Sequence, residues 1–203
     1  MQIAQTYSHL NGEEYLLVHQ PKLYDEIKDV IDNIDATMFL TKVSKEAKKM
    51  GNNLYNPGEL NDAFESQFFN LGWAESRYNY YITLNRDLME QSIQMDAPTQ
   101  RQFLIANGDP APIFSFNQTD FVKNKIAVEI QFGKYSFVAY DLFVKHMMFY
   151  SGGKINLGIE ILPTKNMQNQ MSSGPGYFEG EVYNVMRQGR NSPPVPLLIL
   201  GIE

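Results

Sequence analysis

Two carboxylates lie on either side of a short polar turn, and their spacing is the strongest chemical signal in the chain. Asp120 closes one extended run, residues 123–125 (KNK) form the turn, and Glu129 lies in the next run. If the turn folds the two runs into a hairpin, Asp120 and Glu129 are about equally far from its tip. Paired carboxylates are oxygen ligands that suit a divalent cation such as Mg²⁺. Such a pair would form an oxygen-rich pocket that is suited to a metal ion.

The run after the turn, residues 126–132, alternates as a strand does. Glu129 and Gln131 share one face, and the other face is bulky and apolar, which places the strand in a core. A polar pair on the open face of an ordinary antiparallel strand is the structural alternative. Burying Glu129 beside Asp120 without a cation would bring like charges together, which is costly.

The pattern of Asp120, Glu129 and Gln131 resembles the active-site motif of the PD-(D/E)xK nucleases, with Gln131 where that motif usually has lysine. Longer runs resemble the BglII/BstYI group of type II restriction endonucleases, most of all its BstYI branch, and together they span essentially the whole chain. They are YSHLNG (7–12), TDFVKNKIAVEIQFGKYSFVAYDLFVKH (119–146), IEILP (159–163), MSSG (171–174) and YNVMRQGR (183–190).

This resemblance implies a Mg²⁺-dependent endonuclease that cuts both strands of DNA at a palindromic GATC-core site, R-GATC-Y. Asp120 and Glu129 would hold the metal, with the backbone carbonyl of Ile130 as a further ligand. Gln131 cannot carry a positive charge or act as a base, so its amide would only orient water or phosphate. The burden of activating the nucleophile then moves to metal-bound water.

The resemblance also implies residues that contact double-stranded DNA. Lys134, Ser172 and Ser173 would read bases, because lysine and serine can donate to base edges. Arg187 and Arg190 are expected to face phosphates for a different reason, because they lie at the end of a predicted helix in the more basic half of the chain. The alternatives are a solvated turn lysine and ordinary loop polarity.

Two further expectations come from the same resemblance. Glu75 and Ser76 would lie near an accessory active-site position. A palindromic target needs a two-fold symmetric protein, so we expect a homodimer.

The composition excludes several other chemistries. A chain of 203 residues without cysteine has no disulfide, thiolate zinc site or cysteine nucleophile. His9, His19 and His146 are too isolated for a histidine zinc site. No signal peptide or membrane span is recognisable, so we expect a cytoplasmic protein. The net charge of −6 argues against a generic polyanion binder, although the residues after Asp120 are mildly basic.

Periodicity and punctuation predict the order of elements. We expect helices over residues 21–34, 57–71, 99–107, 137–150 and 177–188, and strands over residues 77–83, 126–132, 155–162 and 195–202. Trp73 should lie in the core. The mixture predicts an α/β fold with a mixed central β-sheet flanked by helices, as a single domain over residues 1–203.

The predicted helix over residues 137–150 is apolar almost all round, which indicates burial on every side. It could be shared with a partner subunit or pass through the core of its own chain, and the sequence favours neither.

Two other functions remain open at this stage. A non-catalytic DNA- or protein-binding module on the same sheet would suit the acidic charge and the missing motif lysine. A metal-dependent repair nuclease would keep the two carboxylates but cut damaged or branched DNA without a fixed sequence.

Overall fold

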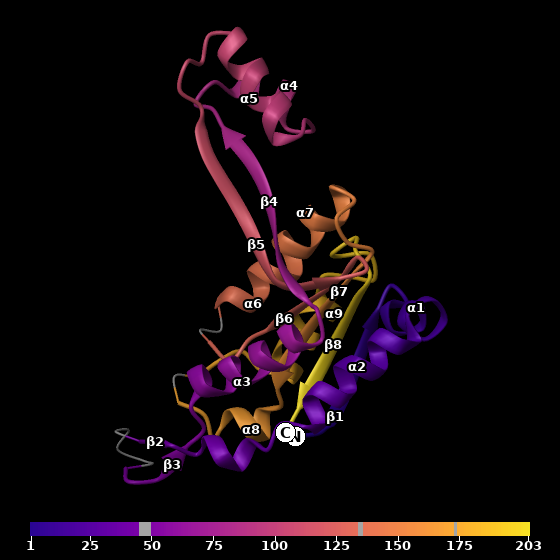
Figure 1. Ribbon diagram of the computed structural model, residues 1–203, viewed down its shortest axis with the longest axis vertical. Coiled ribbons are helices and arrows are strands. Elements are labelled where there is room, and N and C mark those ends of the chain that lie inside the picture. Colours follow the sequence, from indigo (N-terminus) through magenta and orange to yellow (C-terminus); the bar gives the residue numbers. More distant parts are fainter. Residues whose placement is uncertain (45–49, 134–135, 173) are drawn as a thin grey trace. The chain divides into compact units, whose positions relative to one another are not determined.

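The computed structural model describes residues 1–44, 50–133, 136–172 and 174–203. Its central feature is a mixed sheet with the strand order β1-β8-β7-β6-β5-β4 (Figure 1). The strands are β1 (Ile3–His9), β4 (Ala74–Ile82), β5 (Ile113–Lys123), β6 (Ile126–Ile130), β7 (Leu157–Pro163) and β8 (Leu197–Ile202), with β2 (Lys42–Val43) and β3 (Asn53–Leu54) in a separate pair.

Strands β6, β7 and β8 run parallel to one another, and β5 and β1 pair antiparallel with β6 and β8. Parallel neighbours need crossover connections, which are helical here. The sheet therefore has a buried parallel centre, and β6 lies between β5 and β7 rather than at an edge. The prediction that residues 126–132 contain a core strand is confirmed.

Helices cover both faces of this sheet. On one face α1 (Gly12–His19), α2 (Pro21–Asp32) and α3 (Pro57–Asn70) pack against odd residues of β7 such as Ile159 and even residues of β8 such as Leu200. On the other face α9 (Phe178–Arg187) packs against residues such as Ile199. The remaining helices are η1 (Ala36–Phe39), α4 (Arg86–Ser92), α5 (Ala97–Ala106), α6 (Ser136–Tyr140), η2 (Asp141–Lys145), α7 (His146–Ser151) and α8 (Lys165–Gln168).

The predicted α/β class with a mixed central sheet flanked by helices is confirmed. Trp73 is buried as expected, and its indole N–H donates to Glu26 at 3.2 Å. Asn56 caps α3 by accepting from the backbone N–H of Gly58. The sequence did not reveal β1, α1 or α4. None of the described helices is long and apolar enough to cross a bilayer.

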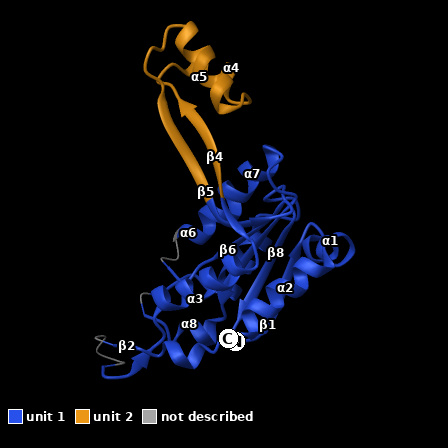
Figure 2. Ribbon diagram, viewed as in Figure 1, with its two compact units in different colours: residues 1–75, 119–203 blue, residues 76–118 orange. Residues whose placement is uncertain are grey.

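The chain divides into two compact units (Figure 2). Unit 1 contains residues 1–75 and 119–203, and unit 2 contains residues 76–118. Unit 2 holds α4, α5 and most of β4 and β5, and Gln100 ties its helices to β4 by accepting from the backbone N–H of Tyr81 at 2.7 Å. The prediction of a single domain over residues 1–203 stays a prediction.

The expected helix over residues 137–150 differs from the prediction in two ways. Its middle, η2, is π-helical and joins α6 to α7. It is also not buried all round, because the sheet covers only one of its faces and leaves apolar side chains exposed on the other. The alternative that this helix passes through the core of its own chain is therefore wrong. The apolar residues that remain exposed are Phe137, Tyr140, Val144, Met147 and Tyr150.

Candidate active site

The hairpin predicted from the spacing of Asp120 and Glu129 is present. Phe121 pairs with Val128, and the antiparallel ladder continues to the turn. Asn124 and Lys125 both have positive φ angles, 48° and 64°. Two such residues in succession give the turn a backbone twist that matches the twist of the strands. The turn thereby brings Asp120 and Glu129 to the end of the ladder, directly after its last pair.

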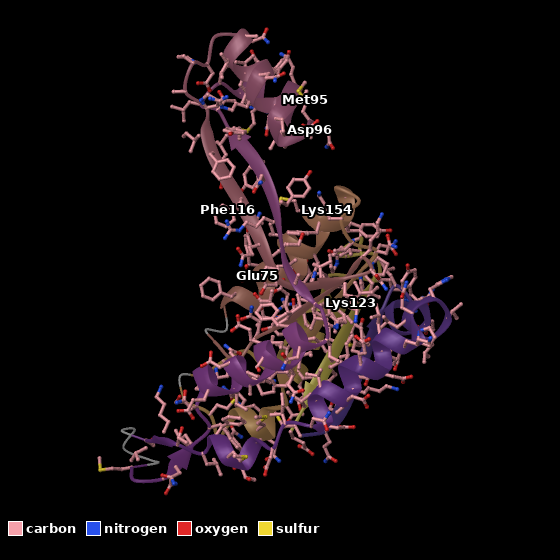
Figure 3. All side chains as sticks on the ribbon, in the orientation of Figure 1. Glu75, Met95, Asp96, Phe116, Lys123 and Lys154 are labelled. Carbon is pink, nitrogen blue, oxygen red and sulfur yellow. The ribbon has the colours of Figure 1, made fainter. Side chains whose placement is uncertain are left out.

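Asp120 opens onto a cavity of about 200 Å³ in unit 1. Glu75, one of the two predicted accessory residues, lines the same cavity. It lies at the start of β4, where Figure 3 labels it. Ser76 is the first residue of unit 2. The cavity therefore gathers several oxygen-bearing side chains above the end of β6; its lining residues are Asn61, Glu65, Phe69, Glu75, Asp120, Phe121 and Ile130.

Glu129 is the chain neighbour of Ile130, which lines this cavity, and its own side chain is fully buried. One carboxylate oxygen accepts a hydrogen bond from the hydroxyl of Thr119. The other is 2.9 Å from the Nζ of Lys145. Burial raises the pKa of Glu129 well above its ordinary value, the negative charge of Asp120 raises it further, and Lys145 acts against both.

Gln131 is held by the helix that follows β6. Its Nε2 donates to Asp141 at 2.6 Å, and the other oxygen of Asp141 is 2.6 Å from Lys145. Burial lowers the pKa of the Lys145 ammonium, but the carboxylates of Glu129 and Asp141 outweigh it, so the pKa is raised and the side chain stays charged. The side chains of Glu129 and Gln131 are thus tied to one helical turn.

A second buried pair lies beside this network. Glu160 is the register partner of Glu129 on β7, and His146 lies 3.0 Å from it. A Cβ at Gly158 would lie 2.5 Å from the imidazole, so only glycine leaves room for the ring. Burial raises the pKa of Glu160 well above its ordinary value and lowers that of His146 to about 3, so the imidazole is neutral at pH 7.

The donor set fits a small, hard cation. Asp120 and Glu129 repel each other electrostatically, and a positive ion would relieve that repulsion. Within the described part of the chain, no group of three or more Asp, Glu, His or Cys side chains could hold a metal by itself. Water and a backbone carbonyl would have to complete the coordination, as is usual for Mg²⁺.

The predicted DNA-contacting residues are scattered in what the structure describes. Lys134 and Ser173 lie outside the described residues. Ser172 is buried, and its backbone N–H donates to the carbonyl of Tyr55 at 3.4 Å. Arg187 is exposed at the end of α9, with its guanidinium 5.7 Å from the centre of the Tyr183 ring, and Arg190 is exposed beyond it. Their roles remain predictions.

Sequence reasoning missed Asp141 and Lys145. A signal was available, because the two residues are opposite charges four positions apart inside an otherwise apolar stretch. Such a pair lies on one helical face. In a helix that packs against a sheet, charges on the buried face need partners, and here the partners are Glu129 on β6 and Gln131 directly after it.

Comparison with known proteins identifies a family and a similar fold. Residues 4–202 match the family described as restriction endonuclease BglII/BglIII. A crystal structure of BglII complexed with a DNA 16-mer is similar over 100% of this chain and 79% of its own, with 18% identity and a TM-score of 0.66. Free BglII is similar over 100% and 80%, with 16% identity and a TM-score of 0.58.

Among curated proteins, no significant sequence match was found. The likeness to the two BglII structures concerns the fold, and it accounts for the mixed sheet. The family match covers nearly all of the chain, from β1 to β8. The chain therefore belongs to the BglII/BglIII family of restriction endonucleases and is a type II site-specific deoxyribonuclease.

Proposed function

We propose that this enzyme makes Mg²⁺-dependent double-strand cuts at a palindromic GATC-core site, R-GATC-Y, as a homodimer. The observation that carries the proposal is the hairpin end, where Asp120 opens onto a cavity and Glu129 lies beside it. The DNA 16-mer bound in the similar BglII structure supports duplex DNA as the substrate. The resemblance of the sequence to the BstYI branch is the support for R-GATC-Y.

Each residue of the hairpin end has a separate task in this proposal. The cation would be held by Asp120, Glu129 and the backbone carbonyl of Ile130. Gln131 would help to position the side chains of the site through its hydrogen bond to Asp141. A bound Mg²⁺ lowers the pKa of water and stabilises the charge on the phosphate. Glu75 would add a carboxylate to the lining of the same cavity. Ser76, the other accessory candidate, follows it directly.

The direct test is incubation of plasmid DNA of known sequence with the enzyme and Mg²⁺, or with a chelator, followed by mapping of the fragment ends. Discrete metal-dependent fragments that end at GATC-containing hexamers support the proposal, and the flanking bases establish the degeneracy. An intact plasmid with every divalent ion would favour a binding module. Nicking at scattered positions would favour a repair nuclease.

Removing either carboxylate should abolish cleavage. We expect Asp120→Ala and Glu129→Ala each to lower kcat by about 10³-fold or more, a loss of at least about 4 kcal/mol in transition-state stabilisation. Binding to the target duplex should persist, because most affinity comes from phosphate and base contacts. Single-turnover cleavage and gel-shift titration measure the two effects. Asp32→Ala, an exposed carboxylate at the end of α2, is the control. Undiminished cleavage by either active-site variant would exclude the assignment.

Base contacts and phosphate contacts can be distinguished by the effect of mutating the residues that make them. Changing Lys134, Ser172 or Ser173 should relax the choice of base at one position of the site. Changing Arg187 or Arg190 should weaken binding evenly on all sequences and reduce the salt slope by about 1 each. Binding titrations on matched and substituted duplexes at several salt concentrations distinguish the two kinds. A base-specific loss in an arginine variant would contradict the phosphate assignment.

A further inference from the structure

Lys145 is the cation that the described structure places among the carboxylates of the site. Its Nζ is 2.9 Å from Glu129 and 2.6 Å from Asp141, and its side chain is only 10% exposed. Exposed ion pairs contribute little, but breaking a buried one leaves the remaining charge uncompensated at a high cost. The two carboxylates therefore depend on this ammonium for their placement.

The contacts of Lys145 extend to Gln131. Asp141 accepts from the Gln131 amide with one oxygen and contacts Lys145 with the other. Glu129 lies in β6 and Gln131 directly follows its last residue, and Asp141 and Lys145 begin and end the π-helical segment η2. Single π-helical turns inside α-helices are frequent at functional sites. This turn presents Asp141 and Lys145 together to the polar face of the strand.

The positive charge of this site comes from Lys145 on the helix, whereas the motif that the site resembles usually has a lysine at the position of Gln131. The strand carries a neutral amide at position 131, where an ammonium could have contacted the same carboxylates directly. The helix supplies that ammonium instead, from 14 positions beyond Gln131. Gln131 and Lys145 share Asp141 as a partner, because each of them contacts one of its two carboxylate oxygens.

We propose that Lys145 is a positioning residue of the cleavage reaction, supplying from the helix the fixed positive charge that position 131 lacks. It holds one oxygen of Glu129 directly and orients the Gln131 amide through Asp141. It does not line the cavity next to Asp120, so it acts through these two side chains rather than on the DNA. The inference rests on the proposed function, since it concerns cleavage by the same carboxylates.

Lys145→Gln tests the role by separating catalysis from folding and binding. We expect kcat to fall by about 100-fold, the size of effect seen when one preorganised polar contact is lost from an active site. The KM for target DNA should stay within about three-fold, because Lys145 is buried away from the cavity. The affinity for Mn²⁺ without DNA, measured by calorimetry, should not fall, because a cation next to Glu129 has been removed.

An exchange of the two side chains is the sharper experiment. The double variant Gln131→Lys/Lys145→Gln returns an ammonium to Glu129 and Asp141 from the strand. We expect it to regain about tenfold in kcat or more over Lys145→Gln alone, or roughly 1.4 kcal/mol. Lys154→Gln is the matched control, because Lys154 is an exposed lysine just beyond the same helix (Figure 3). This variant should cleave DNA as the unmodified enzyme does.

Two results would overturn the proposal. One is a folded Lys145→Gln variant whose kcat stays within about three-fold of the unmodified enzyme. The other is a parallel loss of kcat, Mn²⁺ affinity and unfolding midpoint, which would mean that the lysine serves only stability. If Lys145→Gln does not fold, the double variant decides: folded and active supports the proposal, and folded and inactive overturns it.

The proposed function is tested separately, by the ion dependence and the cleavage site of the unmodified enzyme. All comparisons use the divalent ion and the DNA site with which that enzyme cleaves best. If that ion is not Mg²⁺, or the site contains no GATC, the proposed cofactor or specificity is wrong. The ratio between Lys145→Gln and the unmodified enzyme still measures the contribution of the lysine.

Discussion

At the scale of single residues, the site is a set of buried acids whose protonation the fold controls. Glu129 and Glu160 are register partners on neighbouring strands, and both are fully buried. Their partners differ in charge: Glu129 pairs with the charged Lys145, and Glu160 pairs with the neutral His146. A carboxyl with a charged partner can stay ionised, whereas one with a neutral partner is protonated more readily.

The pH dependence of stability should reveal the state of Glu160. Burial raises its pKa well above the ordinary 4.5, and the charge of Asp141 raises it further. The folded chain therefore holds this proton more tightly than the unfolded chain. The resulting stability is complete below pH 4.5 and is lost as pH rises through the raised pKa. Glu160→Gln, which stays neutral, should match the unmodified chain at pH 5 and exceed it increasingly towards pH 9.

Urea unfolding of the metal-free protein at several pH values measures this difference as a shift in midpoint. The exposed Glu90→Gln in α4 is the control and should follow the unmodified chain at every pH. A constant difference between Glu160→Gln and the unmodified chain from pH 5 to pH 9 would mean that Glu160 does not change its protonation in that range.

At the scale of elements, the turn between β5 and β6 determines which residues meet. Its two central residues, Asn124 and Lys125, have left-handed backbone conformations. Asparagine tolerates this region, but lysine is strained there by about 1 kcal/mol because of its Cβ. The chain accepts this strain where the register of the hairpin is determined, and a slip of one residue would turn Glu129 away from Lys145.

Lys125→Gly should stabilise the protein, because glycine adopts positive φ without a steric cost. We expect a gain of about 1 kcal/mol, or about 2–4 °C in Tm for a chain of this size. Differential scanning calorimetry measures it. Lys125→Ala is the control: it removes the same charge but keeps the Cβ, and should gain nothing. An equal gain in both variants would show that charge rather than backbone strain is responsible.

At the scale of the whole molecule, one surface of the α6–η2–α7 helix needs an explanation. This surface consists of the five apolar side chains of the helix that remain exposed, among which Phe137 is 55% and Val144 is 42% exposed. Exposed apolar side chains that share one helix are costly in water and can mark an interaction site. The face lies on the helix that carries Asp141 and Lys145, so a second subunit bound there would also brace the active site.

We therefore predict that the proposed homodimer forms through this surface and that Val144→Glu leaves a monomer. A buried charge at the interface would be left without a partner, which opposes association. Analytical ultracentrifugation should give twice the chain mass of 23.3 kDa for the unmodified protein and a single chain mass for the variant. Val18→Glu is the control, because Val18 is an exposed apolar residue in α1. A dimer that survives Val144→Glu would place the interface elsewhere.

The sequence by itself determined what depends on neighbours along the chain. The turn at residues 123–125 and the alternation after it predicted the hairpin, and with it the meeting of Asp120 and Glu129. Periodic apolar residues predicted α2, α3 and α9. Such features are local, because a strand repeats every two residues and a helix every 3.6. The family resemblance then supplied the nuclease activity that these patterns do not contain.

Only the tertiary structure decided which charges surround the carboxylates. Lys145 and Asp141 reach Glu129 and Gln131 because a helix crosses over the sheet between β6 and β7, and no spacing along the chain shows where that helix lies. The same packing exposes one apolar face of the helix and buries the other. It also places Glu160 beside Glu129, 31 positions earlier, through the pairing of parallel strands. Contacts of this kind depend on how layers pack, which local periodicity does not specify.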